Sequence, residues 1–218
     1  MPPDFAKYLI GCRRKSYSPG EPIFYQGEVP PLGMFVKSGV IKAYDIGNNG
    51  DEKTVALIGR NEFIPPAWFF GKSSASLYYY QAFTESVLIS VQREAVRQLI
   101  ETSNEFAKYM FDKYIGLFMG AVQHVNALEQ SKSSAKIAFI LQHLLTKFGK
   151  PIGNGNHLIP IRLTHQDIAS MTGLTRETTS VELSRLKKRG IISYKDQHYV
   201  IATEKLQALF GLEDFYKL

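Results

Sequence analysis

The feature that most constrains the fold is the stretch 163–192, where two short helical patterns meet at a single glycine. Thr164 is a suitable N-cap for the first helix, and Asp167 follows three residues later, as in a capping box. Gly173 can adopt the left-handed backbone conformation that ends a helix and makes a sharp turn. Thr175 is then a suitable N-cap for the second helix. The spacing therefore predicts a helix-turn-helix.

The second helix has two distinct faces. Thr179, Leu183 and Leu186 recur at helical spacing and are expected to face the core. The opposite face carries an arginine that can pair with guanine, a glutamate that can accept from cytosine, and a valine that can pack on a thymine methyl. This pattern predicts that the helix at 175–189 reads the major groove of double-stranded DNA. We expect DNA contacts from Thr164, Thr175, Arg176, Glu177, Ser180, Val181, Ser184 and Lys187.

Two further features of the C-terminal part agree with this prediction. The β-rich pieces 191–195 and 199–201 predict a two-stranded wing after the second helix. Residues 131–218 hold 13 Lys and Arg against 7 Asp and Glu, whereas residues 1–130 hold 13 of each. The whole formal charge of +6 therefore lies in the C-terminal part. A basic domain attached to a neutral one is typical of a protein whose two parts have different tasks, one of them phosphate binding.

The N-terminal half is a succession of short β-rich pieces separated by Gly, Pro-Gly and Asn-Gly turns. Such regular short strands predict a small barrel or jelly roll. We therefore expect an α+β fold with an N-terminal, jelly-roll-like β-roll, a long dimerisation helix and a C-terminal winged helix-turn-helix. The expected boundaries are 1–101 for the β-roll, 102–130 for the helix and 131–218 for the DNA-binding domain.

The expected long helix carries a periodic apolar pattern. Thr102 to Glu105 form a capping-box sequence at its start. Apolar residues then alternate at spacings of three and four, as in a coiled-coil seam. The seam residues are Phe111, Tyr114, Phe118, Ala121, Val125 and Leu128. Two chains paired along this seam would present two recognition helices one DNA turn apart, which predicts a homodimer on a near-palindromic operator.

Several stretches resemble members of one family. Residues 17–28, 34–44 and 59–64 look like the opening strands of a cyclic-nucleotide-binding-type β-roll, and 175–178 resembles the start of the family's recognition helix. Over nearly its whole length the chain resembles the Crp/Fnr superfamily of bacterial regulators. The resemblance implies a transcription regulator rather than an enzyme, with RNA polymerase as a further partner if it activates. Family members often have an arginine where this chain has Val181, so the operator is expected to depart from the usual half-site.

The resemblance also implies where a cyclic nucleotide would bind. The family's cassette has a Gly-Glu pair after position 64, where this chain has Pro65-Pro66. An Arg-Ser pair follows in the family, where this chain has Ser76-Leu77. The family's Glu would bind a ribose hydroxyl and its Arg the cyclic phosphate. A buried phosphate without its countercharge is very costly, so cyclic AMP is disfavoured as an effector.

The region that replaces the cassette is rich in aromatic residues, and two interpretations stay open. One is an apolar pocket for a small-molecule effector that is not a cyclic nucleotide, with tyrosine hydroxyls to orient it. The other is a packed β-roll core that seats the long helix, in a regulator that binds DNA without a ligand. The residues of the first interpretation are Pro65, Trp68, Leu77, Tyr79, Tyr114 and Phe118.

Cysteine and histidine usage limits the other sites that the chain can build. Cys12 is the single cysteine, so an intramolecular disulfide and a cysteine-bound iron–sulfur cluster are excluded. No histidine precedes His124, which argues against haem in the β-roll and against the remaining alternative, a metal-dependent barrel enzyme. We therefore expect no metal or other cofactor. The absence of a long apolar run and of a secretory-signal pattern predicts a cytoplasmic protein without a membrane partner.

Overall fold

The computed structural model describes residues 1–210 and has the expected α+β fold. Its Cα trace divides into two compact units, Met1–Phe118 and Met119–Leu218. The helix α4 (Asn104–Leu128) begins in the first unit and ends in the second. None of the helices in the described range is both long enough and apolar enough to cross a membrane.

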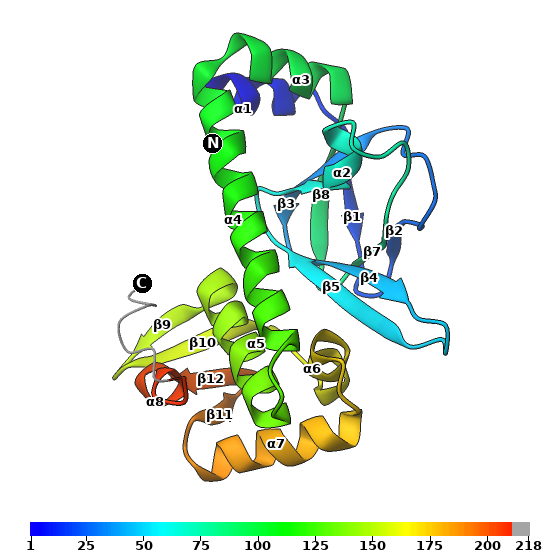
Figure 1. Cartoon of the computed structure of the whole chain (residues 1–218). Coiled ribbons are helices and arrows are strands. Elements are labelled where there is room, and N and C mark those ends of the chain that lie inside the picture. The colour runs from blue at the N-terminus through cyan, green and yellow to red at the C-terminus, as the bar shows by residue number, and fades with distance from the viewer. Residues whose placement is uncertain (211–218) are drawn as a thin grey trace. The chain divides into compact units, whose positions relative to one another are not determined.

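The first unit is a sandwich of two antiparallel four-stranded sheets (Figure 1). The first sheet has the order β1 (Arg14–Tyr17), β8 (Ser86–Val91), β3 (Gly33–Ser38), β6 (Phe63–Ile64). The second has the order β2 (Pro22–Phe24), β7 (Tyr79–Ala82), β4 (Ile41–Ile46), β5 (Glu52–Ile58). The prediction of a β-roll from short strands and frequent turns is confirmed.

The central strands of the first sheet, β8 and β3, have buried residues on both faces, and this places the aromatic residues. Neighbouring residues of a strand point to opposite faces, so Val36 joins the core between the sheets and Phe35 points away from it. Phe35 belongs to a second core under a layer of helices, which also contains Trp68. That layer is formed by α1 (Pro3–Ile10), α2 (Pro66–Phe69), α3 (Arg93–Thr102) and the start of α4. The helices α1, α2 and α3 are not among the elements predicted from the sequence.

The start of α4 differs from the predicted capping box. Thr102 is the last residue of α3, and its hydroxyl donates to the Gln98 carbonyl at 2.8 Å. Ser103 caps α4 instead, because its Oγ accepts from the Phe106 backbone N–H at 3.3 Å. The capping box proposed for Thr102 to Glu105 is therefore wrong: a helix directly upstream uses Thr102.

The second unit contains the helix-turn-helix and a small sheet. Its helices are α5 (Ser133–Phe148), α6 (His165–Thr172), α7 (Arg176–Lys188) and α8 (Thr203–Gln207). The sheet has the order β11 (Ile192–Lys195), β12 (His198–Ala202), β10 (Asn156–Arg162), β9 (Lys150–Gly153). The strands β11 and β12 form a hairpin directly after α7, so the predicted wing is confirmed. Asp196 and Gln197, both with positive φ, make its turn.

Candidate functional site

The two helices of the helix-turn-helix are fixed by local hydrogen bonds at their ends. Thr164 and Asp167 form a reciprocal capping box at the start of α6. Gly173 ends α6 in the left-handed region, with φ 66°. The Thr175 side chain accepts from the Thr178 backbone N–H at 3.1 Å and begins α7. Each of these features follows the sequence prediction, because each depends on residues only a few positions apart.

The inner face of α7 is buried, as its spacing predicts. Thr179, Leu183 and Leu186 are each at most 2% exposed. Glu182 is also buried on this side, and its carboxylate binds the Arg185 guanidinium at 2.5 Å. The sequence reading missed Glu182, although its position between Thr179 and Leu186 gives the same helical phase. The ion pair joins a buried carboxylate to an exposed guanidinium and holds Arg185 at the edge of the outer face.

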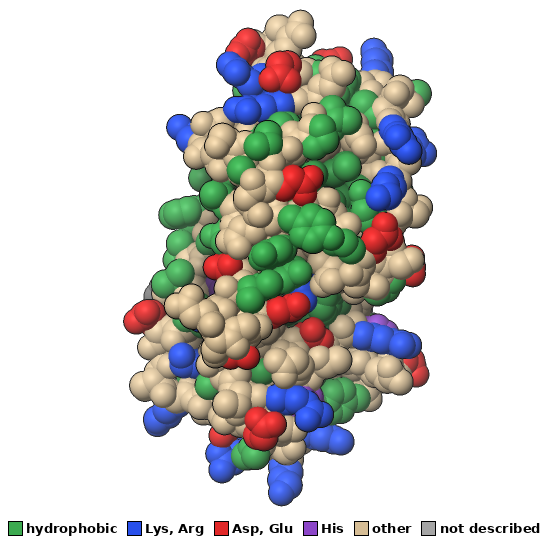
Figure 2. Space-filling model, turned by 90° about the vertical axis from the view of Figure 1, so that its right-hand side faces the viewer, with side chains coloured by type: hydrophobic (Ala, Val, Ile, Leu, Met, Phe, Trp, Pro, Cys, Tyr) green, Lys and Arg blue, Asp and Glu red, His purple; other side chains and the backbone are tan. Residues whose placement is uncertain are grey.

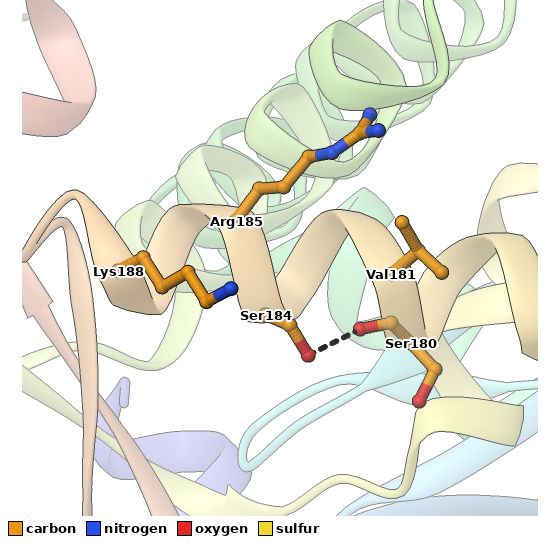
Figure 3. Close-up of a pocket in the computed structure, with 5 residues that line it drawn as sticks. All are labelled: Ser180, Val181, Ser184, Arg185 and Lys188. Carbon is orange, nitrogen blue, oxygen red and sulfur yellow. Dashed lines mark hydrogen bonds between the residues drawn. The ribbon is translucent and has the colours of Figure 1, made fainter.

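The outer face of α7 is a shallow hollow of about 300 Å³ (Figure 3). Ser180, Val181, Ser184, Arg185 and Lys188 line it. Val181 is 51% exposed at the middle of this face. The Ser184 hydroxyl donates to the Ser180 carbonyl at 2.8 Å, which keeps it close to the helix surface. The face therefore combines hydroxyls, a methyl surface and two cationic groups, which are the side-chain types that contact DNA bases and phosphates.

His165 is a residue of this site that the sequence reading missed. Its Nδ1 lies 2.8 Å from Ser180 Oγ, so the first residue of α6 holds a side chain on the outer face of α7. Fifteen positions separate the two residues, and no local periodicity relates them. The contact depends on the angle that the turn at Gly173 sets between α6 and α7, so the sequence alone does not predict it.

Basic side chains surround the end of α7. Arg185, Lys187, Lys188 and Arg189 are all exposed. Figure 2 shows several Lys and Arg side chains at the edge of the second unit along which α7 lies. The Lys187 ammonium lies 5.4 Å from the centroid of the Tyr194 ring on β11. This cation–π contact links the helix end to the wing.

The predicted base contacts at the start of α7 lie on its surface. Arg176 and Glu177 are exposed in its first turn, beside the Thr175 cap. The Thr164 and Thr175 hydroxyls are already used in helix capping. The arrangement thus leaves the Arg and Glu head groups directed to the surroundings and gives the two threonines a structural role.

The first unit contains a cavity of about 350 Å³ between its second sheet and the middle of α4. Strand residues Ala43, Val55, Ala56, Ile58 and Tyr80 line one part of it. Phe63, Pro66 and Tyr78 line a second part, and Tyr114, Leu117 and Phe118 of α4 close it. No residue of this lining is ionised at neutral pH, so the cavity lacks a countercharge for a phosphate.

The hydroxyl oxygen of Tyr114 is the polar atom of this cavity that bears most on ligand binding. Its ring packs edge-on against Phe70, with 4.3 Å between the ring centroids, while its buried Oη has no hydrogen-bond partner in the described part of the chain. Burial raises the pKa of Tyr114, and the nearby Glu62 carboxylate raises it further. The hydroxyl therefore stays protonated and can donate a hydrogen bond.

Both units of the chain match families of known proteins. Residues 135–209 match the model of the Crp-like helix-turn-helix domain, and residues 14–103 match that of the cyclic nucleotide-binding domain. The chain belongs to the Crp/Fnr family. A Crp/Fnr protein of this architecture is a DNA-binding transcription regulator that acts through its helix-turn-helix, not an enzyme, and the family is typically dimeric.

Individual Crp/Fnr proteins are similar over most of the chain. The global nitrogen regulator of Nostoc sp. is 27% identical over 180 residues, which cover 82% of this chain and 80% of the relative. The cyclic AMP receptor protein of Thermus thermophilus is 26% identical over 182 residues, which cover 83% of this chain and 79% of the relative. The solved structure of FixK2 from Bradyrhizobium japonicum has a TM-score of 0.75 at 19% identity, and the match covers 91% of this chain and 96% of that one.

The positions of the Crp/Fnr nucleotide cassette have other roles in this chain. Pro65 follows a cis peptide bond, and Pro66 begins α2 and lines the cavity. Ser76 is 2% exposed, and its hydroxyl donates to the Tyr78 carbonyl at 2.7 Å. Leu77 is exposed and its carbonyl accepts from Gln26. These residues shape the loop between α2 and β7.

Only two of the six residues predicted to form an aromatic pocket line this cavity. Tyr114 and Phe118 line the cavity. Trp68 packs in the core under the helices, where the Arg93 guanidinium lies 5.3 Å from its ring centroid. Tyr79 stacks on Tyr44 with 5.2 Å between ring centroids. Strand alternation alone does not identify the strand residues of the lining, because the adjacent Val55 and Ala56 both line the cavity.

The predicted seam of α4 has exposed and buried members. Phe111, Phe118, Ala121, Val125 and Leu128 are exposed, whereas the Tyr114 side chain is directed into the first unit. Other large apolar side chains of α4 are also exposed: Ile115 at 46%, Met119 at 50% and Val122 at 37%. We call the exposed residues Phe111, Ile115, Phe118, Val122 and Val125, spaced by four and three, the α4 stripe.

Proposed function

We propose that this Crp/Fnr protein is a homodimer that reads a near-palindromic operator through α7 and responds to a small-molecule effector in the β-roll. The observation that carries the proposal is the outer face of α7, where Arg176 and Glu177 are exposed beside a capped helix start and Val181 beside them is 51% exposed. Head groups of these types can discriminate base pairs in the major groove. The regulator would contact RNA polymerase if it activates transcription.

The α4 stripe supports the homodimer. Its five large side chains are exposed in one chain, and their spacing of four and three is that of a coiled-coil seam. A contiguous apolar strip of this kind is unfavourable in water and marks an interaction surface. A second copy of the chain, paired through the same stripe around a two-fold axis, would bury it.

The dimer is tested by neighbouring substitutions on α4. Ile115→Asp places a charge in the stripe, and we expect it to produce a monomer with the same circular dichroism spectrum as the unmodified protein. Gly116→Asp is the matched control, because Gly116 is off the stripe and a Cβ there meets no atom within 4 Å. Light scattering gives the mass of each variant. A dimeric Ile115→Asp protein, or a monomeric unmodified protein at micromolar concentration, would exclude the stripe as the interface.

DNA reading is tested by Arg176→Ala. We expect specific binding to weaken by about 1–3 kcal/mol on the operator recovered by selection, with little change on scrambled DNA. Arg97→Ala removes the same charge from an exposed position of α3 and serves as the control. Fluorescence anisotropy at fixed salt measures both affinities. Equal weakening on both DNAs would instead make Arg176 a phosphate contact.

A regulator that needs no ligand is the alternative. The different use of the cassette positions favours it, because Ser76 and Pro66 serve the loop and α2. In that case the β-roll only holds α4, and operator affinity would be the same with and without any cavity ligand. The pocket of about 350 Å³ favours the effector-controlled form, because ligand sites are typically apolar hollows with a few polar groups.

A further inference from the structure

The cavity in the first unit has a chemistry that specifies its ligand. Its volume of about 350 Å³ lies at the small end of the range of ligand pockets, about 300–1,000 Å³. It is larger than the apolar cavity of about 150 Å³ that holds one benzene molecule. The space therefore suits a compact molecule of about two rings, or an aliphatic molecule of similar volume.

The charge around the cavity disfavours an anion. Its lining contains aliphatic side chains, aromatic rings and phenol hydroxyls, with no lysine, arginine or histidine. The Glu62 carboxylate lies close enough to Tyr114 to raise the pKa of that phenol further than burial alone does. An anionic group placed here would lose its hydration without gaining a cation from the lining.

Tyr114 supplies the polar contact that orients the ligand. Its Oη is buried without a partner among the described residues, and it lies on the helix that closes the cavity. A ligand atom that accepts a hydrogen bond from this hydroxyl would satisfy a group that is otherwise buried at a cost. Tyr78 and Tyr80 line the same cavity, and burial raises the pKa of Tyr80, so this phenol also stays protonated.

The cavity wall includes a residue of the proposed dimer contact, so a bound ligand would be able to affect that contact. Tyr114, Leu117 and Phe118 form its α4 wall over slightly more than one helical turn. Phe118 is 63% exposed and also belongs to the α4 stripe. A ligand in the cavity would therefore touch a residue of the proposed dimer contact.

We propose that the effector is an uncharged, largely apolar molecule of about two-ring size that offers a hydrogen-bond acceptor to Tyr114 Oη. This inference deepens the proposed effector function and rests on it. Cyclic nucleotides and other anions are outside the class, since they carry a charge that the lining does not neutralise.

Three molecules of similar shape test the proposal with the full-length protein. Benzophenone has two rings and a carbonyl acceptor, 1,1-diphenylethylene replaces the oxygen by a methylene, and diphenylacetate carries a negative charge. Each displaces the neutral two-ring fluorescent probe prodan, a naphthalene ketone, if it enters the cavity. We expect benzophenone to bind about two- to tenfold more tightly than 1,1-diphenylethylene, the usual effect of one hydrogen bond. Diphenylacetate and cyclic AMP are expected to displace no probe at the benzophenone concentrations used.

Two variants assign the preference to Tyr114. Tyr114→Phe should bring the affinities of benzophenone and 1,1-diphenylethylene together. Tyr109→Phe is the control on the same helix, because the Tyr109 hydroxyl donates to the Asn61 carbonyl at 3.3 Å and Tyr109 is not in the lining. Ala56→Phe should abolish probe binding, because it fills the cavity from β5. A preference that survives Tyr114→Phe, or tight binding of diphenylacetate, would overturn the proposal, as would the absence of any saturable probe binding.

Operator binding measured on the same samples separates this proposal from the proposed function. Specific DNA binding together with absent probe binding would refute the ligand class alone. Probe binding with the expected Tyr114 dependence, together with no specific DNA binding, would refute the regulator function and leave the cavity chemistry intact.

Discussion

Tyr114→Phe removes a hydroxyl group from α4, and we expect this change to stabilise the first unit. A buried hydroxyl without a partner costs about 1–3 kcal/mol in desolvation. Phenylalanine removes this cost and keeps the edge-on contact with Phe70, whose ring centroid is 4.3 Å away. The lost oxygen forfeits several dispersion contacts of about 0.1–0.2 kcal/mol each. The net effect is a gain of about 1 kcal/mol in the free energy of unfolding.

Thermal unfolding followed by tryptophan fluorescence measures this effect in the right part of the chain. The single tryptophan, Trp68, is buried in the first unit and reports its unfolding. A gain of about 1 kcal/mol corresponds to a rise of about 2–4 °C in Tm for a chain of this size. Tyr109→Phe, which breaks the bond to the Asn61 carbonyl, should lower Tm by a similar amount. Equal losses of stability in both variants would refute the assignment of Tyr114 Oη as an unsatisfied donor.

Three other predictions concern the second unit. Burial, with Lys147 and His124 nearby, lowers the pKa of His143 from 6.5 to about 4, so the fold favours its neutral form. The contribution of His143 to the free energy of unfolding is present above pH 6.5 and is lost as the pH falls toward 4. In urea titrations at several pH values, His143→Gln should remove on the order of 3 kcal/mol of this loss. The same dependence of unfolding free energy on pH in both proteins would contradict the prediction. Thr164→Ala breaks the capping box of α6 and should cost about 1 kcal/mol in the same assay; no measurable loss would mean that the cap contributes nothing. Lys187→Ala should weaken binding to all DNA sequences equally and lower the salt slope by about one, whereas a loss confined to one sequence would identify a base contact.

Local features of the second unit could be predicted from the sequence. The cap at Thr164, the turn at Gly173 and the inner stripe of α7 depend on residues within one or two helical turns, so their spacing is sufficient. The frequent turns of the first unit likewise predict its short strands. Thr102 shows the limit of the same reasoning, because a preferred capping residue was already inside a preceding helix.

Contacts between distant segments could not be predicted in this way. The pairing of His165 with Ser180 depends on the angle between α6 and α7. The direction of Tyr114 depends on the sheet against which α4 packs, because a three-four apolar pattern does not say which residues face a partner helix and which face the β-roll. Trp68 lies among other aromatic residues in the sequence and is therefore expected in the pocket, but α2 directs it into the core under the helices.

The base preferences of the selected operator test the central claim most directly. Double-stranded DNA is selected from a random pool with the unmodified protein and with Arg176→Ala, and the bound sequences are read. Two related half-sites about one DNA turn apart are expected, with one position in each half-site relaxed in the variant. A single asymmetric site, or profiles that are identical for the two proteins, would contradict a symmetric dimer that reads DNA through Arg176.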